Sequence, residues 1–304
     1  MGTETGVLGR LEVEAEMINY DEEEDENQQQ KEKKILSQPF IELGRFHTNR
    51  VTGIKELGAT TQLITVSEDH YMSVWEATSQ HMLASVYQPA YPCALDVSVD
   101  GTASFIGTAM GAFRIYDLTD RQAPRLVQQI RFFEDISAID IVQASKDGKY
   151  VLVTSKGKEI VHILSAEAER GFNVLGYIQF DGSIRSACFT MKDGATRMLA
   201  VLANGLLAGA LVPSASAENG MEPFPESIVA TTYRKIDRGM NMVISNHTNG
   251  DVYVCGEDKL LKKYEFPTEK LQQLDFKRAP PAPAEELQSH AIGTTCWDVS
   301  KEFK

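Results

Sequence analysis

The chain has 304 residues, with 43 acidic and 30 basic side chains and a formal net charge of −13. This length can bury a large hydrophobic core, and the acidic balance argues against a surface that follows the phosphates of nucleic acid. The sequence has no apolar run of the roughly 18 residues that a membrane-spanning helix needs. Its N-terminus also lacks the basic and then apolar order of a secretory signal. We therefore expect a cytoplasmic protein without membrane or nucleic-acid partners.

Residues 1–38 are predicted to form an acidic, largely disordered arm. They hold 11 acidic and 4 basic side chains, and residues 21–26 are six acids in succession, followed by asparagine and glutamines. Like charges at close spacing repel one another, and this run offers no apolar side chains to bury. The arm is expected to be a solvated linker, and an acidic docking tail for a basic partner is the alternative.

From residue 39 onward the sequence predicts β-strands. Residues 39–46 are expected to be an outer strand. Residues 63–77, LITVSEDHYMSVWEA, alternate in the manner of a hairpin around the polar turn at residues 68–70. Predicted strands at residues 51–54 and 81–87 flank this hairpin, so the first unit has four strands.

The pattern of the first unit recurs four times. The repeats lie at residues 102–119, 149–166, 196–214 and 250–267. If Trp75, Tyr116, Ile163, Leu211 and Tyr264 mark the same position, the intervals are 41, 47, 48 and 53 residues. Predicted inner strands precede the repeats at residues 93–97, 136–142, 184–190 and 240–245. Units of four short strands at this period are typical of β-propeller blades.

The first unit also resembles a known repeat family. In "GRFHTNRVTGI" and "LITVSEDHYMSVWEA", the order of a Gly-His-like pair, a Ser-x-Asp turn and a Trp-Asp-like pair is similar to that of WD40 repeats. The resemblance implies an all-β, WD40-like β-propeller over residues 39–304, with about five full blades plus a partial one. It also implies a structural hydrogen-bonded set inside the first blade. Its members would be His47, Thr65 or Ser67, Asp69 and Trp75.

The sequence predicts no catalytic residues, no metal site and no cofactor. It contains no phosphate-binding Gly-rich loop, no His-Glu-x-x-His or paired Cys-x-x-Cys motif, and no Gly-x-Ser-x-Gly elbow. A lone strand histidine such as His162 is typical of a structural residue. The four widely spaced cysteines are expected to be reduced core residues. We expect no small-molecule substrate, and an enzyme with a site in the central channel is the less favoured alternative.

WD40-like proteins usually bind other proteins, although a fold alone does not establish a function. In the family, the loops between blades share one face with the turns between the second and third strands of each blade. The candidate partner-binding residues on this face are Tyr91, Met110, Phe133 and Asp135. The alternative for the aromatic residues is that they pack between neighbouring blades.

A narrower resemblance concerns residues 61–140. Phrases such as residues 87–91 and 131–135 look like the WD-repeat cilia- and flagella-associated proteins of the axoneme. This resemblance implies a structural or regulatory subunit of a large complex, located in the cytoplasm and in the cilium or flagellum. The alternative is a substrate receptor or adaptor of a ubiquitin-ligase or other regulatory assembly.

The end of the sequence predicts an incomplete sixth unit. The Pro-rich residues 279–288 are expected to be a loop, and residues 290–300 to be an inner strand. Together with the outer strand at residues 39–46, this unit would lack its two middle strands. Because propeller rings avoid open sheet edges, the chain is expected to be part of a longer protein or to be completed by a partner.

Overall fold

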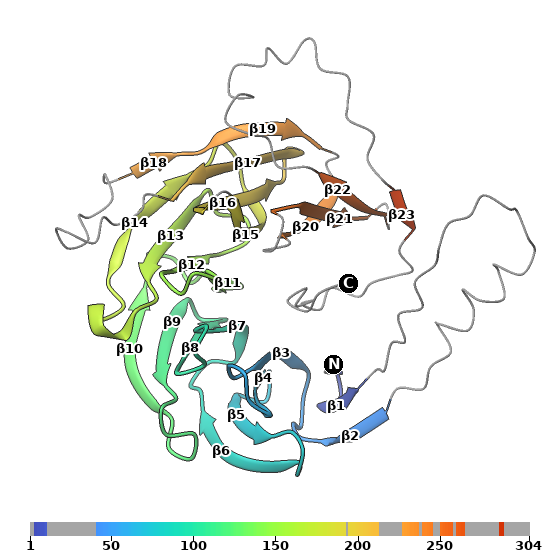
Figure 1. The fold of residues 1–304 in the computed structure, drawn as a ribbon, viewed down its shortest axis with the longest axis vertical. Coiled ribbons are helices and arrows are strands. Elements are labelled where there is room, and N and C mark those ends of the chain that lie inside the picture. Colours follow the sequence, from blue (N-terminus) through green and yellow to red (C-terminus); the bar gives the residue numbers. More distant parts are fainter. Residues whose placement is uncertain are drawn as a thin grey trace, which may run out of the picture.

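The computed structural model describes residues 3–10, 41–192, 194–212, 227–236, 239–245, 250–257, 260–264 and 286–288. In these residues the secondary structure is β-strand, apart from one 3-10 helix, η1 (Ala168–Arg170). Five sheets of four or five strands follow one another around a common axis, and we call them blades 1 to 5 (Figure 1). In each blade the strand that comes first in the sequence lies innermost.

Each blade is an antiparallel meander running outward from the axis. Blade 1 contains β3 (Val51–Glu56), β4 (Gln62–Ser67), β5 (Tyr71–Glu76) and β6 (His81–Tyr87). Blade 2 contains β7 (Pro92–Val97), β8 (Ala103–Thr108), β9 (Ala112–Asp117) and β10 (Arg125–Arg131). Blade 3 contains β11 (Ile141–Ala144), β12 (Tyr150–Thr154), β13 (Ile160–Ser165) and β14 (Val174–Gln179). Blade 4 contains β15 (Ile184–Lys192), β16 (Ala195–Leu202), β17 (Leu206–Leu211) and β19 (Thr231–Lys235). Blade 5 contains β20 (Met240–Ser245), β21 (Val252–Gly256), β22 (Leu260–Tyr264) and β23 (Glu286–Gln288).

The core lies between successive blades, so the middle strands are buried on both faces. In β12, Val151 and Val153 pack into the cluster shared with blade 2, whereas Leu152 packs into the cluster shared with blade 4. Similar clusters join blade 1 to blade 2 and blade 4 to blade 5. Because side chains alternate along a strand, each middle strand is covered on both faces, and β8 and β12 are buried at every position.

Polar side chains on the inner strands connect one blade to the next. The Asp96 carboxylate on β7 pairs with the Lys55 ammonium of blade 1 at 3.0 Å and accepts the Ala144 amide of blade 3 at 2.7 Å. The side-chain Oε1 of Gln143 on β11 accepts a hydrogen bond from the Phe189 backbone amide of blade 4 at 2.7 Å. These bonds satisfy backbone donors that no sheet ladder reaches, and they fix the spacing of the inner strands.

An extra strand joins blades 3 and 4. After β17, the chain crosses to blade 3 and forms β18 (Ser227–Val229), which pairs in parallel with β14. It then returns to blade 4 as β19, and the Ala230 amide donates to the Gln179 carbonyl at 2.9 Å. Blade 3 therefore has five strands, and its outer edge is covered by a segment that belongs to the next blade in sequence.

Several strands differ from the sequence expectation. β1 (Val7–Arg10) lies inside the segment assigned to the acidic arm, where it pairs with β2 (Ile41–Arg45), the expected outer strand. β23 lies within the Pro-rich segment expected to be a loop, and it completes blade 5. β11 starts at Ile141, five residues later than predicted. The acidic run at residues 21–26, the expected inner strand at residues 290–300 and Cys296 lie outside the described residues.

Candidate functional site

The residues of the expected hydrogen-bonded set meet inside blade 1. The His47 ring lies 2.9 Å from the Asp69 carboxylate through Nδ1 and 2.7 Å from the Thr65 hydroxyl through Nε2. The Trp75 indole donates to the same hydroxyl at 2.8 Å. Thr65 therefore takes the central position that the sequence left open between Thr65 and Ser67.

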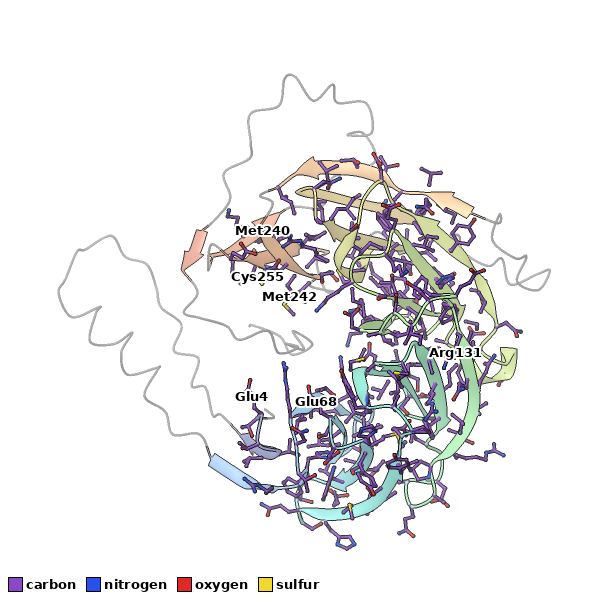
Figure 2. The ribbon with its side chains drawn as sticks, turned by 180° about the vertical axis from the view of Figure 1, so that it is seen from behind. Glu4, Glu68, Arg131, Met240, Met242 and Cys255 are labelled. Carbon is purple, nitrogen blue, oxygen red and sulfur yellow. The ribbon has the colours of Figure 1, made fainter. Side chains whose placement is uncertain are left out.

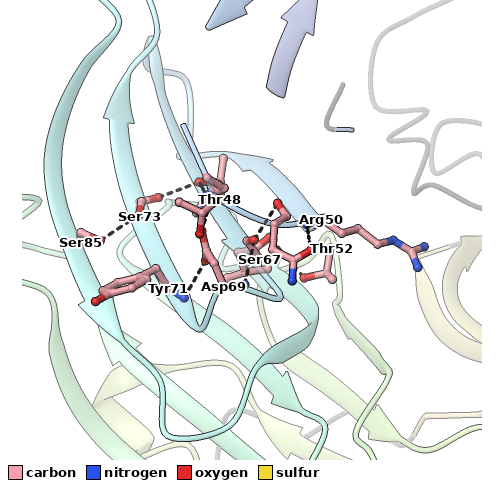
Figure 3. Close-up of polar contacts among 12 residues, drawn as sticks. Thr48, Arg50, Thr52, Ser67, Asp69, Tyr71, Ser73 and Ser85 are labelled. Atoms are coloured by element: carbon pink, nitrogen blue, oxygen red, sulfur yellow. Dashed lines mark hydrogen bonds and ion pairs between the residues drawn. The ribbon is translucent and has the colours of Figure 1, made fainter. Parts of the chain in front are cut away.

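Ser67 and Asp69 hold the turn between β4 and β5 (Figure 3). The Ser67 hydroxyl donates to the Asn49 carbonyl at 3.1 Å and accepts the Asp69 amide at 3.2 Å. The Asp69 carboxylate accepts the amides of Thr48 at 2.9 Å and Tyr71 at 3.0 Å. The set thus connects the loop that precedes β3 to the turn between β4 and β5.

Burial decides the charge states in this set. Burial lowers the pKa of His47, although the Asp69 carboxylate opposes this, so the ring is neutral near pH 7. Burial alone would raise the pKa of Asp69, but the hydrogen bond from the Thr48 amide and the nearby His47 ring lower it overall. A neutral ring donates from Nδ1 to Asp69, so its Nε2 accepts the Thr65 hydroxyl proton.

The order Thr65–His47–Asp69 has the connectivity of a hydrolytic triad, but its burial makes it structural. Thr65 is fully buried and His47 is 4% exposed. The Thr65 oxygen also receives the Trp75 indole proton. A substrate carbonyl therefore cannot reach the hydroxyl, as nucleophilic attack requires.

Other blades fill the equivalent positions with different chemistry. The strand registers place Tyr116 and Leu164 where blade 1 has Trp75, so Leu164, rather than Ile163, marks the third repeat. In blade 2, the side-chain Oε1 of the buried Gln88 accepts a hydrogen bond from the Arg114 guanidinium at 2.9 Å, and its Nε2 donates to the Tyr116 hydroxyl at 2.9 Å.

In blade 3, the region that corresponds to the hydrogen-bonded set of blade 1 is an aromatic stack around His162. The His162 ring lies 4.5 Å from the Phe132 ring and 6.2 Å from the Tyr177 ring, centroid to centroid. Burial lowers the pKa of His162 to about 4, so it is a neutral packing residue.

The candidate partner-binding residues lie on adjacent loops at one end of blades 1 to 3. Tyr91 is 41% exposed in the loop between blades 1 and 2, and Met110 is 47% exposed in the turn between β8 and β9. The Ala109 amide donates to the Tyr91 carbonyl at 3.0 Å, which joins loop to turn. The loop after β10 lies next to the β8–β9 turn, because the Ile139 amide donates to the carbonyl of Thr108, the last residue of β8, at 3.0 Å.

Phe133 and Asp135 come from that third loop and are less available. The Phe133 ring is half-buried and packs edge-on against His162 at 5.5 Å, with the Lys158 ammonium 5.1 Å from its centroid. The Asp135 carboxylate is exposed but pairs with Lys158 at 2.6 Å. Phe133 therefore packs at the seam between blades, the alternative that the sequence left open, while Tyr91 and Met110 face outward.

No family model and no curated protein sequence matches the chain. Among solved structures, the chain is similar to one in "Crystal Structure of Mitotic Checkpoint Complex", with a TM-score of 0.58 and 12% sequence identity. The match covers 75% of this chain and 65% of that one, so the protein spans about two thirds of the length of the chain it resembles. The fold is a WD40-like β-propeller. The expected class, about five full blades with a partial one, is confirmed.

Sequence reasoning named Tyr91 but missed the aromatic group to which it belongs on the same face of the propeller. We call this group the tyrosine cluster: His70, Tyr71, Tyr87 and Tyr91. The His70 ring stacks on Tyr87 at 5.9 Å and meets Tyr91 edge-on at 6.1 Å. The Tyr71 ring contacts Tyr87 at 5.7 Å. Tyr71 and Tyr87 are register partners at the open end of the β5–β6 hairpin. The predicted strand ends could therefore have revealed the pair.

The described part of the propeller contains no group of three or more His, Cys, Asp or Glu side chains placed to hold a metal ion. Cys93, Cys188 and Cys255 are free thiols. Burial raises the pKa of Cys93 and of Cys188 to about 12, so neither forms a thiolate near pH 7. None of the described residues forms a helix long and apolar enough to span a membrane.

Proposed function

We propose that the protein is a non-catalytic scaffold that binds other proteins through the face formed by the loops between blades and the β8–β9 turn. The observation that carries this proposal is the exposure of large hydrophobic side chains on three adjoining segments. Tyr91, Met110 and Ile136 are 41%, 47% and 66% exposed. Aromatic residues and methionine are enriched at the centres of protein interfaces.

Substituting glutamate on this face tests the proposal. In proximity labelling or co-precipitation, Met110→Glu and Ile136→Glu are expected to lose partners that the wild-type protein retains. Val127→Glu is the matched control, because Val127 is 46% exposed on β10, the outer strand of blade 2. If all three variants keep the same partners, this face is not the binding surface.

The more specific proposal is a structural or regulatory subunit of a ciliary or flagellar axonemal complex, which would place the protein in the cytoplasm and the cilium. Its support is the sequence resemblance over residues 61–140. Enrichment with axonemal microtubules is the expected result. Recovery with a ubiquitin-ligase adaptor, without axonemal proteins, would favour the alternative of a substrate receptor.

A further inference from the structure

We propose that the tyrosine cluster binds a segment of a partner protein that carries arginine or lysine side chains. The cation would lie over the exposed tyrosine rings and next to two carboxylates near the propeller axis, Glu68 and Asp140. This inference rests on the proposed function, because it names the kind of partner that one part of the same face accepts.

The cluster is the main aromatic surface on the described part of the molecule. Of twelve large hydrophobic side chains exposed there, three are aromatic, and all three belong to the cluster. Tyr71, Tyr87 and Tyr91 are 41%, 59% and 41% exposed. The negative face of an aromatic ring attracts an ammonium or guanidinium ion. Tyr71 contacts Tyr87, and the His70 ring lies between Tyr87 and Tyr91, so the three tyrosines offer several such faces close together.

The His70 ring, which contacts both Tyr87 and Tyr91, is held in place before any ligand arrives. His70 has a left-handed backbone, with φ of 72°. Its carbonyl accepts the Gln88 amide at 2.6 Å, and its Nδ1 lies 3.1 Å from the Gln88 carbonyl. The Gln88 side chain is in turn fixed by Arg114 and Tyr116 in the blade 1–2 core. The His70 side chain therefore loses little entropy when a ligand binds.

The charges next to the cluster favour a cation. Glu68 lies two residues before His70 in the same turn and points toward the inner end of blade 1 (Figure 2). Its contact with Arg50 is long, at 4.0 Å. Asp140 is linked to the cluster through Cys93, which comes two residues after Tyr91. The Cys93 thiol donates to the carbonyl of Ile139, the residue before Asp140, at 3.4 Å. Lys156 is the opposing cation nearby, and its amide donates to Asp140.

The Cys93 thiol is close enough to both carboxylates for their charges to act on its pKa. Burial is the largest cause of its raised pKa, and the negative charges of Asp140 and Glu68 add to it, while Lys156 acts in the opposite direction. An acidic segment laid across the cluster would meet the repulsion of both carboxylates. A basic segment would meet attraction there, and the net charge of −13 would also draw it to the protein from a distance.

Fluorescence anisotropy with the full chain tests the inference. The probes are a short labelled peptide of alternating arginine and glycine, a matched peptide with glutamate for arginine, and a polyproline peptide. The arginine peptide is expected to bind, with an affinity that falls as salt rises. Tyr87→Leu and Tyr91→Leu are each expected to weaken it about 2–5-fold, and Glu68→Gln to reduce its salt dependence.

Met82→Leu is the matched control, because Met82 is 45% exposed near the other end of the same strand, β6. It should bind like the wild type. Equal binding of the glutamate or polyproline peptide, or unchanged affinity in both tyrosine variants, would overturn the inference. If the Met110 and Ile136 variants still lose protein partners in that case, the proposed scaffold function stands, and only the proposed site or the charge of its partner is wrong.

Discussion

Replacing Thr65 with valine should separate the hydrogen bonds of blade 1 from its packing. Valine has nearly the shape of threonine, so the core stays filled, but the hydroxyl between His47 and Trp75 is lost. The Trp75 indole proton and the His47 Nε2 atom both depend on that hydroxyl, at 2.8 and 2.7 Å, and neither side chain is more than 7% exposed. Water therefore cannot replace the missing partner.

The cost follows from the two groups left unsatisfied. A buried donor or acceptor without a partner costs about 1–3 kcal/mol, so the variant should lose about 2–6 kcal/mol of unfolding free energy. For a chain of this length, roughly 2 °C of melting temperature corresponds to each kcal/mol, which predicts a drop of about 4–12 °C. Thermal melts followed by Trp fluorescence and urea titrations would measure it.

Thr65→Ser is the control, because it keeps the hydroxyl and removes one methyl group, which should cost about 1 kcal/mol. If the valine variant melts within about 2 °C of the wild type, or if serine is as damaging as valine, the hydrogen-bonded set does not hold blade 1 together. The reasoning about buried partners would then be wrong for this protein.

Three further predictions concern neighbouring features. Trp75→Ala should cost about 3–5 kcal/mol, because it removes a large buried ring that also packs on Phe46 at 4.4 Å; a small shift in the melting temperature would contradict this. Gly6→Ala should detach β1 from β2 and destabilise blade 1, because φ at Gly6 is +80° and an added Cβ would lie 2.0 Å from the His47 carbonyl oxygen. Unchanged hydrogen exchange at the backbone amides of Phe46 and His47, which both donate to the Gly6 carbonyl, would argue against this. Unfolded His162 protonates near its ordinary pKa of 6.5 but the folded residue only near 4, so stability should fall as pH drops from 6.5 toward 4. His162→Phe should flatten that dependence in urea titrations.

The sequence was most informative where local pattern decides the structure. The hairpin at residues 63–77 became β4 and β5, and the Asp100-Gly101 turn formed with Gly101 at φ of +74°. The members of the blade 1 set could be listed because each occupies a fixed place in one repeat. The choice between Thr65 and Ser67 could not be made, because both lie on the same face of β4 and the answer depends on how far along the strand the His47 ring lies.

The strands that were missed all pair with distant segments. β1, β18 and β23 have three or four residues each, too few for a period to be read, and each joins a partner more than 20 residues away. Their strand state comes from the edge that they cover and not from local propensity. The tyrosine cluster was missed because its two halves, His70 with Tyr71 and Tyr87 with Tyr91, meet only when the β5–β6 register is set.

The crossover that places β18 on blade 3 has a consequence for synthesis on the ribosome. Blade 3 can form its first four strands as soon as β14 emerges, but the residue that pairs with Gln179 is Val229, 50 positions later. At translation rates of about 5–20 residues per second, the outer edge of β14 stays uncovered for roughly 3–10 s. During that interval the nascent chain exposes unpaired backbone groups, so this is the stage at which a chaperone, or a wrong strand, would meet it.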